Sequence, residues 1–140
     1  MKKEKKKEAK KEKSIKGLLS FITKYQEKNE MHITLQIRAG FMAYHFWKNA
    51  PKEVSFLRNP HRHIFSVTAM LPVTDENREL EFFIVQRDLI KYLRSNYEGK
   101  TFGKSCEIFA KEIKKYLDTK YLRSCSVGVY EDGENGAIVQ

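Results

Sequence analysis

Three of the four histidines in the chain have the spacing of a metal site. His61 and His63 stand at i and i+2 in a β-rich segment, so both imidazoles point to one face of a strand. His45 lies in the preceding β-rich segment, which can pair antiparallel with the second and bring a third imidazole alongside. Three neutral imidazoles with one open position are typical of a catalytic zinc, which acidifies a bound water or substrate oxygen. Surface or hydrogen-bonded histidines are the alternative, and His32 is expected to be structural.

Two predicted strands carry these histidines. Alternating side chains predict a long first strand over residues 31–47, with a bend or bulge near Gly40, and a second strand over residues 61–72. Asparagine and proline residues at 48–60 predict a loop between them. The antiparallel pairing of these two strands must therefore position the imidazoles.

Two helices and a hairpin follow in the chain. Glycines mark a loop over residues 95–104, and alternation predicts a strand over 122–131 that turns back into 137–140. Helical spacing predicts two amphipathic helices, on Val85, Leu89, Tyr92 and Leu93 and on Phe109, Ile113, Tyr116 and Leu117. This order of elements predicts an α+β fold with both helices on one face of an antiparallel sheet.

Lysine and glutamate dominate the N-terminus. Residues 1–13 hold eight lysines and three glutamates, which supply +5 of the net charge of +9. We expect a solvated, disordered tail, because such a segment cannot bury apolar surface. Contact with nucleic acid or another polyanion is the alternative, which the interleaved glutamates disfavour. Residues 14–30 are expected to form a short helix with the apolar residues Ile15, Leu18, Leu19, Ile22 and Tyr25 on one face.

Length and composition limit the class of protein. A chain of 140 residues, 41% of them hydrophobic, predicts one folded domain. No stretch approaches the roughly 20 apolar residues of a membrane span, and no apolar run follows the N-terminal charges as in a signal peptide. The two cysteines, Cys106 and Cys125, make no disulfide framework, so a reducing cytoplasm is the expected location.

The histidines belong to a longer series of motifs. These are Phe41-Met-Ala43-Tyr-His45, His61-Arg-His63, Ser105-Cys106-Glu107 and Val129-Tyr130-Glu131-Asp132. In this order they resemble the 6-pyruvoyl-tetrahydropterin synthases and the related 6-carboxytetrahydropterin synthases of deazaguanine biosynthesis, over residues 31–140. The resemblance implies a ββααββ tunnelling fold (T-fold), Zn²⁺ on the three histidines, and a homo-oligomer, trimer or hexamer, whose edge strands at 31–47 and 135–139 pair between subunits.

The resemblance also implies a ring-binding role for four residues. Glu131 is similar to the family glutamate that anchors the pterin ring, since a carboxylate accepts two parallel hydrogen bonds. Ser105, Cys106 and Glu107 are similar to the segment that meets the edge of the pterin at a helix start. From the residues alone, Glu131 can instead face solvent, Ser105 can be a helix cap, and Glu107 can favour the helix dipole.

Two departures from the family pattern concern proton transfer. Leu57 stands where the family has a cysteine, and the loop 95–104 lacks the family's aspartate–histidine pair. A thiolate and an imidazole have the pKa values that proton transfer at neutral pH requires. Glu53 is a candidate catalytic substitute in the same loop as Leu57. Cys106 is another, since a helix N-terminus lowers a thiol pKa.

These observations leave three functions open. The first is a zinc-dependent pterin-type lyase or synthase acting on a dihydroneopterin triphosphate-like substrate, in the tetrahydropterin or 7-deazaguanine pathway. Arg58 and Arg62 are candidates to hold its triphosphate, or are simply surface charges. The second is a non-catalytic module that binds a pterin or purine ring. The third is a structural or nucleic-acid-associated protein that uses the lysine tail.

Overall fold

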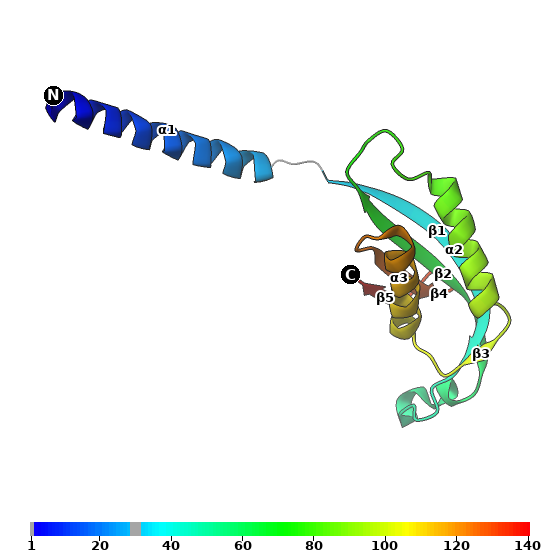
Figure 1. The fold of residues 1–140 in the computed structure, drawn as a ribbon. Helices are drawn as coiled ribbons and strands as arrows, with labels where there is room; N and C mark the ends of the chain where they lie inside the picture. Colours follow the sequence, from blue (N-terminus) through cyan, green and yellow to red (C-terminus); the bar gives the residue numbers. More distant parts are fainter. Residues whose placement is uncertain (1, 29–31) are drawn as a thin grey trace. The chain divides into compact units, whose positions relative to one another are not determined.

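The computed structural model describes residues 2–28 and 32–140, which belong to two separate units, shown in Figure 1. One unit contains a single helix, α1 (Lys2–Lys28). The other runs from Ile33 to Gln140 and contains the sheet and the remaining helices. The predicted boundary between helix and domain, at residues 29–31, lies outside the described residues.

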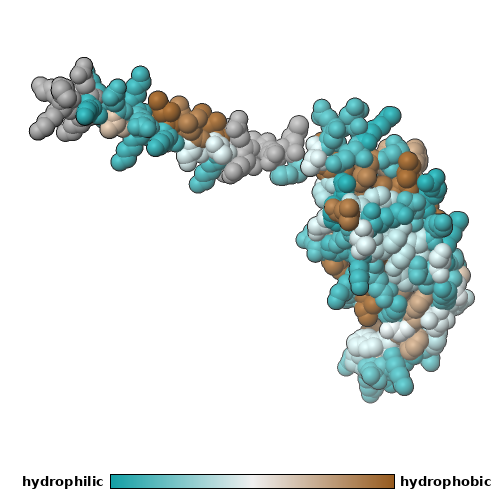
Figure 2. Space-filling view, in the orientation of Figure 1, coloured by the Kyte–Doolittle hydropathy of each residue, from teal (hydrophilic) through white to brown (hydrophobic). Residues whose placement is uncertain are grey.

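Helix α1 includes residues 2–13, for which the sequence predicted a disordered tail. The structure extends the predicted short helix back to Lys2. Lysine, glutamate and alanine are good helix formers, and Glu12 and Lys16 add an i, i+4 ion pair at 4.0 Å. Figure 2 shows apolar side chains gathered on the C-terminal half of α1, where the exposed residues include Ile15, Leu18, Leu19 and Ile22. Among the described residues, no helix combines the length and apolar character needed to cross a membrane.

The sheet contains the strands that the sequence predicts and one that it does not. The strands are β1 (Ile33–His45), β2 (His61–Val73), β3 (Thr101–Phe102), β4 (Ser126–Glu131) and β5 (Gly136–Val139). In the described residues they lie in the order β3-β1-β2-β4-β5. All neighbours pair antiparallel except the unpredicted β3, which pairs parallel with the end of β1. The predicted α+β fold with its ββααββ order is confirmed.

The predicted bulge near Gly40 is wrong. The register between β1 and β2 runs without interruption from Ile33↔Val73 to His45↔His61. A Cβ at Gly40 would lie 3.0 Å from the main-chain oxygen of Phe65, so glycine here permits close approach of the two strands. The unbroken register fixes which residues of β1 and β2 share a face.

Two helices cover one face of the sheet and enclose the core. Helix α2 (Phe82–Asn96) packs on β1, and helix α3 (Cys106–Tyr121) packs on β4 and β5, as Figure 1 shows. A short 3-10 helix, η1 (Lys52–Arg58), lies between β1 and β2. The core contains the fully buried side chains Phe65, Phe109, Leu71, Leu89, Leu93, Ile113 and Leu117. Cys125 is 1% exposed and belongs to the core.

Candidate metal centre and ring-binding cleft

The three histidines lie at the end of the core-facing side of the sheet. On β2, His61 and His63 continue the alternating row that includes the buried Phe65, and on β1 His45 continues the row of Phe41. The register places His45 opposite His61. Ring centroids are separated by 4.5 Å (His45–His61), 5.2 Å (His45–His63) and 5.1 Å (His61–His63). The predicted meeting of three imidazoles is confirmed.

An oxygen atom holds the Nδ1 atom of each ring. The contacts are His45 with the Lys104 carbonyl at 3.0 Å, His61 with the Asn59 carbonyl at 2.8 Å, and His63 with Asp132 Oδ2 at 2.6 Å. Carbonyl and carboxylate oxygens only accept, so each Nδ1 carries the proton and donates it. Each neutral ring therefore presents an unprotonated Nε2, which is the tautomer that a metal ligand needs.

The Nε2 atoms and one carboxylate face a common point. The buried Nε2 atoms of His45 and His61 have no hydrogen-bond partner among the described residues, and the ligand atoms of the three rings lie within 4.8 Å of one another. Glu131 Oε1 lies 3.2 Å from His45 Nε2, and Oε2 lies 3.5 Å from His63 Nε2. An unprotonated Nε2 and a carboxylate oxygen are both acceptors, so a metal cation, or a proton on the imidazole, is needed between them. This donor set fits a metal ion.

Burial favours the neutral form of the most enclosed histidine. It lowers the pKa of His45 below the ordinary value, and the charges of His61 and His63 act in the same direction. The Lys104 carbonyl and Glu131 oppose this effect. A neutral imidazole is the form that coordinates a metal, so this environment suits a ligand.

A cleft of about 600 Å³ opens over His45 and His61. One set of lining residues supplies polar groups: His45, His61, Ser105, Cys106, Glu107 and Glu131. A second set supplies apolar surface: Phe46, Trp47, Leu57 and Ile108. Clefts of this size with apolar walls and a few convergent polar groups are typical of small-molecule sites.

Comparison with solved structures finds the same architecture. The 6-pyruvoyl tetrahydropterin synthase of Caenorhabditis elegans superimposes with a TM-score of 0.61 at 12% sequence identity, over 79% of this chain and 96% of that synthase. The domain is a T-fold. No protein-family model matches the chain, and no curated protein sequence does. At this identity the likeness establishes the fold, and the relationship to the synthase is distant.

The start of α3 brings Ser105, Cys106 and Glu107 into the cleft, and the end of β4 brings the fourth predicted ring-binding residue, Glu131. Ser105 occupies the N-cap position but makes no side-chain capping bond. Hydrogen bonds from the main chain of Glu107 and from Ser105 lower the pKa of the Glu107 carboxyl. The Cys106 Sγ atom donates to Glu131 Oε1 at 3.9 Å. The structure thus gathers these residues, while their ring-binding role stays a prediction.

The prediction of a lowered thiol pKa at Cys106 is wrong. Burial, followed by the charges of Glu131 and Glu107, raises the pKa of this thiol to about 12. The position at a helix N-terminus is real, but desolvation and two nearby carboxylates outweigh the helix dipole. Cys106 is therefore a neutral thiol at physiological pH.

The loops of the T-fold domain supply little acid–base chemistry to the cleft. Leu57 lines it, whereas Glu53 lies exposed on η1 and is not among the residues that line it. In the loop 95–104, the carboxylate of Glu98 accepts a hydrogen bond from the main-chain N–H of Met42. Arg58 donates to the Ala50 carbonyl at 2.8 Å and stabilises its own loop.

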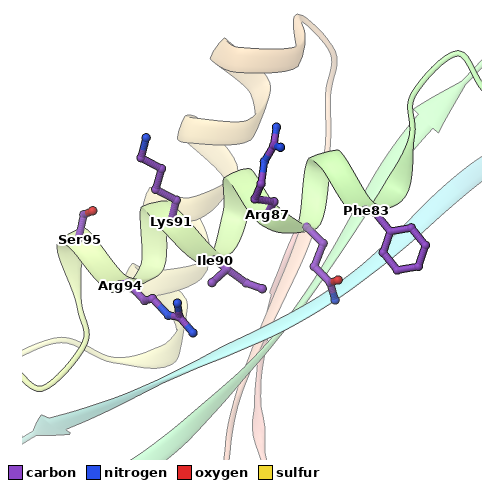
Figure 3. Close-up of a pocket in the computed structure, with 7 residues that line it drawn as sticks. Phe83, Arg87, Ile90, Lys91, Arg94 and Ser95 are labelled. Atoms are coloured by element: carbon purple, nitrogen blue, oxygen red, sulfur yellow. The ribbon is translucent and has the colours of Figure 1, made fainter.

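A second hollow lies along α2, away from the histidines. It has a volume of about 420 Å³ and is lined by Phe83, Gln86, Arg87, Ile90, Lys91, Arg94 and Ser95. Figure 3 shows the labelled side chains spread along both sides of the helix rather than turned toward one point. Its lining contains no histidine, cysteine or carboxylate, and its charged groups are the cations Arg87, Lys91 and Arg94.

Sequence reasoning gave no role to two groups that orient the histidines. Strand β3 pairs with the end of β1 and brings the Lys104 carbonyl to His45. Every residue has a main-chain carbonyl, so the sequence does not indicate which carbonyl will contact a histidine. Asp132 follows Glu131 in the last of the quoted motifs, and its carboxylate contacts His63.

Proposed function

We propose that this protein is a zinc-dependent, pterin-type lyase or synthase that acts on a dihydroneopterin triphosphate-like substrate, in the tetrahydropterin or 7-deazaguanine pathway. The observation that carries the proposal is the convergence of three imidazoles and the Glu131 carboxylate at one point, beside a cleft that His45, His61 and Glu131 line. Zinc held by His45, His61 and His63 would supply Lewis-acid polarisation of substrate oxygens.

The cleft has the features that a flat, nitrogen-rich ring requires. Phe46, Trp47 and Ile108 offer apolar surface for its faces. An aminopyrimidine edge donates in parallel from an amino group and a ring N–H, and the two oxygens of Glu131 can accept both.

A second candidate function is a non-catalytic module that binds a pterin or purine ring beside the metal. Two observations favour it. Leu57, which has no titratable group, lines the cleft where the resembled family has cysteine, and Cys106 remains a neutral thiol. Both candidates share the metal and the ring, and they differ only in turnover.

Incubation of the zinc-loaded protein with dihydroneopterin triphosphate, followed by chromatographic product analysis, separates the two. Loss of the triphosphate with formation of a new pterin supports the lyase or synthase. Binding of the compound without any product supports the module. A protein that neither binds nor converts dihydroneopterin triphosphate, neopterin or a 7-deazaguanine precursor contradicts both.

We also propose that the chain forms a homo-oligomer, a trimer or a hexamer. In the described residues, β3 covers only the last two positions of β1, and β5 has one strand neighbour. Uncovered edges of this kind offer main-chain hydrogen bonds to another subunit. Light scattering of the purified protein measures the mass, and a monomer at micromolar concentration would contradict the proposal.

A further inference from the structure

The carboxylate of Asp132 contacts the histidine triad from the side opposite its ligand atoms. Asp132 Oδ2 lies 2.6 Å from His63 Nδ1, which is the shortest of the three Nδ1 contacts. A carboxylate can only accept here, so the ring donates from Nδ1 and keeps Nε2 unprotonated. The side chain therefore fixes both the tautomer and the orientation of one candidate ligand.

The main chain around Asp132 holds this carboxylate in place. Its N–H donates to the Ile64 carbonyl at 2.8 Å, and its Oδ1 accepts from the Ile64 N–H at 3.0 Å. Both carboxylate oxygens are thus engaged, one by the main chain of β2 and one by His63. The last paired residues of β2 and β4 are Phe65 and Glu131. One residue further along, the side chain of Asp132 accepts the hydrogen bond from the Ile64 N–H.

The backbone of Asp132 adopts a conformation that glycine would take more easily. Its φ is 51° and that of Gly133 is 75°, and Glu134 N donates to Glu131 O across them at 2.9 Å. Positive φ at both central residues is the pattern of a type I′ turn, for which glycine is favoured and aspartate is tolerated. A left-handed, non-glycine residue whose side chain reaches a candidate metal ligand suggests a role beyond the turn.

Asp132 differs from the oxygens that hold the other two rings. His45 and His61 donate to neutral main-chain carbonyls, whereas His63 donates to an anion. A negative partner raises the basicity of an imidazole ligand and offsets the positive charge of a bound metal. The same hydrogen bond thus orients His63 and strengthens it as a ligand.

We propose that Asp132 is a positioning residue for the metal: its carboxylate, fixed between the main chain of Ile64 and His63 Nδ1, sets the tautomer and ligand strength of His63. The inference rests on the proposed metal centre and adds a specific determinant of its affinity. It assigns Asp132 no contact with a substrate.

The test compares Asp132→Gly and Asp132→Asn with the wild type in zinc affinity, measured by competition with a chromophoric chelator. Glycine accepts the left-handed backbone and removes only the carboxylate, near the 53%-exposed Ile64 where water can replace the lost bond. We expect zinc affinity to fall by about 10- to 100-fold, with the melting temperature of the metal-free protein little changed.

The asparagine variant tests whether zinc affinity depends on the tautomer of His63 or only on the packing around it. Its amide oxygen should remain with the Ile64 N–H, which can only donate, so its NH₂ group faces His63 Nδ1. Nδ1 must then accept, and the proton moves to Nε2, where the metal binds. We expect zinc affinity at least as low as in the glycine variant, and a changed visible absorption spectrum of the Co²⁺-substituted protein.

Leu122→Gly is the matched control. Leu122 also has a left-handed backbone, with a φ of 52°, and its side chain is 88% exposed. The zinc affinity of the Leu122→Gly variant should equal that of the wild type. If the wild type binds zinc and both Asp132 variants bind it within twofold as tightly, the inference is overturned while the metal centre stands. If the wild type itself binds no zinc, both the inference and the proposed function fail.

Discussion

Two sets of residues at or beside the cleft contrast in how much chemistry they offer. The metal set consists of His45, His61 and His63, and each of these rings is oriented through Nδ1. The acid–base set consists of Leu57 and Cys106. These are the positions at which the family resemblance or the helix N-terminus pointed to a proton-transfer group. One member has no titratable group, and the other has its pKa raised to about 12 by burial and nearby carboxylates.

The difference follows from how each set is positioned. The metal set lies on β1 and β2, whose register cannot slip by one residue without turning core residues such as Phe65 to solvent. Leu57 lies on η1, which contains no buried residue, and segments of this kind tolerate substitution far better. A site built on paired strands can therefore keep its metal while the surrounding segments change the chemistry performed beside it.

Loss of a ligand should produce the largest effect. Wild-type protein is expected to bind about one zinc per chain and to melt at a higher temperature with it. His61→Ala should abolish stoichiometric zinc, because two imidazoles and a carboxylate remain without the oriented triad. Elemental analysis and thermal melts measure both quantities. His32→Ala, at the exposed fourth histidine, is the control and should keep the zinc. If the wild-type protein contains no metal and its melting temperature does not change with zinc, the three histidines are not a metal site.

The acid–base set predicts an unreactive thiol. Because the pKa of Cys106 is raised from 9.0 to about 12, its thiolate population at pH 8 should be roughly a thousandfold below that of an ordinary cysteine. Iodoacetamide labelling followed by peptide mass spectrometry should find Cys106 unmodified in the folded protein and fully modified in denaturant. Labelling faster than that of free glutathione would show an activated thiolate and restore Cys106 as a candidate catalyst.

Glu131 belongs to neither set and should link the metal to the ring. Glu131→Gln replaces two acceptors by one acceptor and one donor, so it should weaken binding of a pterin or purine-like ring by tenfold or more, since a hydrogen bond to a charged group contributes about 1.5–3 kcal/mol. Calorimetry with biopterin, neopterin and 7-deazaguanine precursors measures this. Glu134→Gln, in the exposed turn, is the control. Equal affinity of the Glu131 variant and the wild type for every ring tested would contradict the anchoring role.

A small effect is expected from Glu53→Ala. Glu53 is exposed and is not among the residues that line the cleft, so conversion of dihydroneopterin triphosphate should change by less than about twofold, the range of neutral surface substitutions. Steady-state rates measured with the zinc-loaded protein test this. A loss of tenfold or more would mean that η1 folds over the cleft during turnover and would return an acid–base group to it.

No effect on metal content is expected from removing residues 1–13. This segment contributes lysines and glutamates to α1, and the domain from Ile33 to Gln140 has its own core. Zinc content and melting temperature of the truncated protein should match those of the full chain. A fall of several degrees in the melting temperature would show that the segment stabilises the domain.

The sequence by itself determined the fold class and the three histidines that could hold a metal ion. Alternation along residues 33–45 and 61–73 encodes strands with one buried face, and a spacing of two puts His61 and His63 on that face wherever the strand lies. The third ligand needed only the pairing of neighbouring strands, which is the commonest arrangement for consecutive strands. These features depend on residues that lie close together in the sequence, so they can be recognised from the sequence alone.

Only the tertiary structure decided the protonation and the orientation of the site. The Lys104 carbonyl reaches His45 across 59 positions of the chain, and Asp132 reaches His63 across 69. The thiol of Cys106 remains protonated because folding buries it beside Glu131, an effect opposite to that of its helix N-terminus. Burial and charge pairing depend on the whole packed environment, whereas residue type and spacing do not. The sequence therefore identified the candidate ligands, and folding determined which of their atoms face the common point.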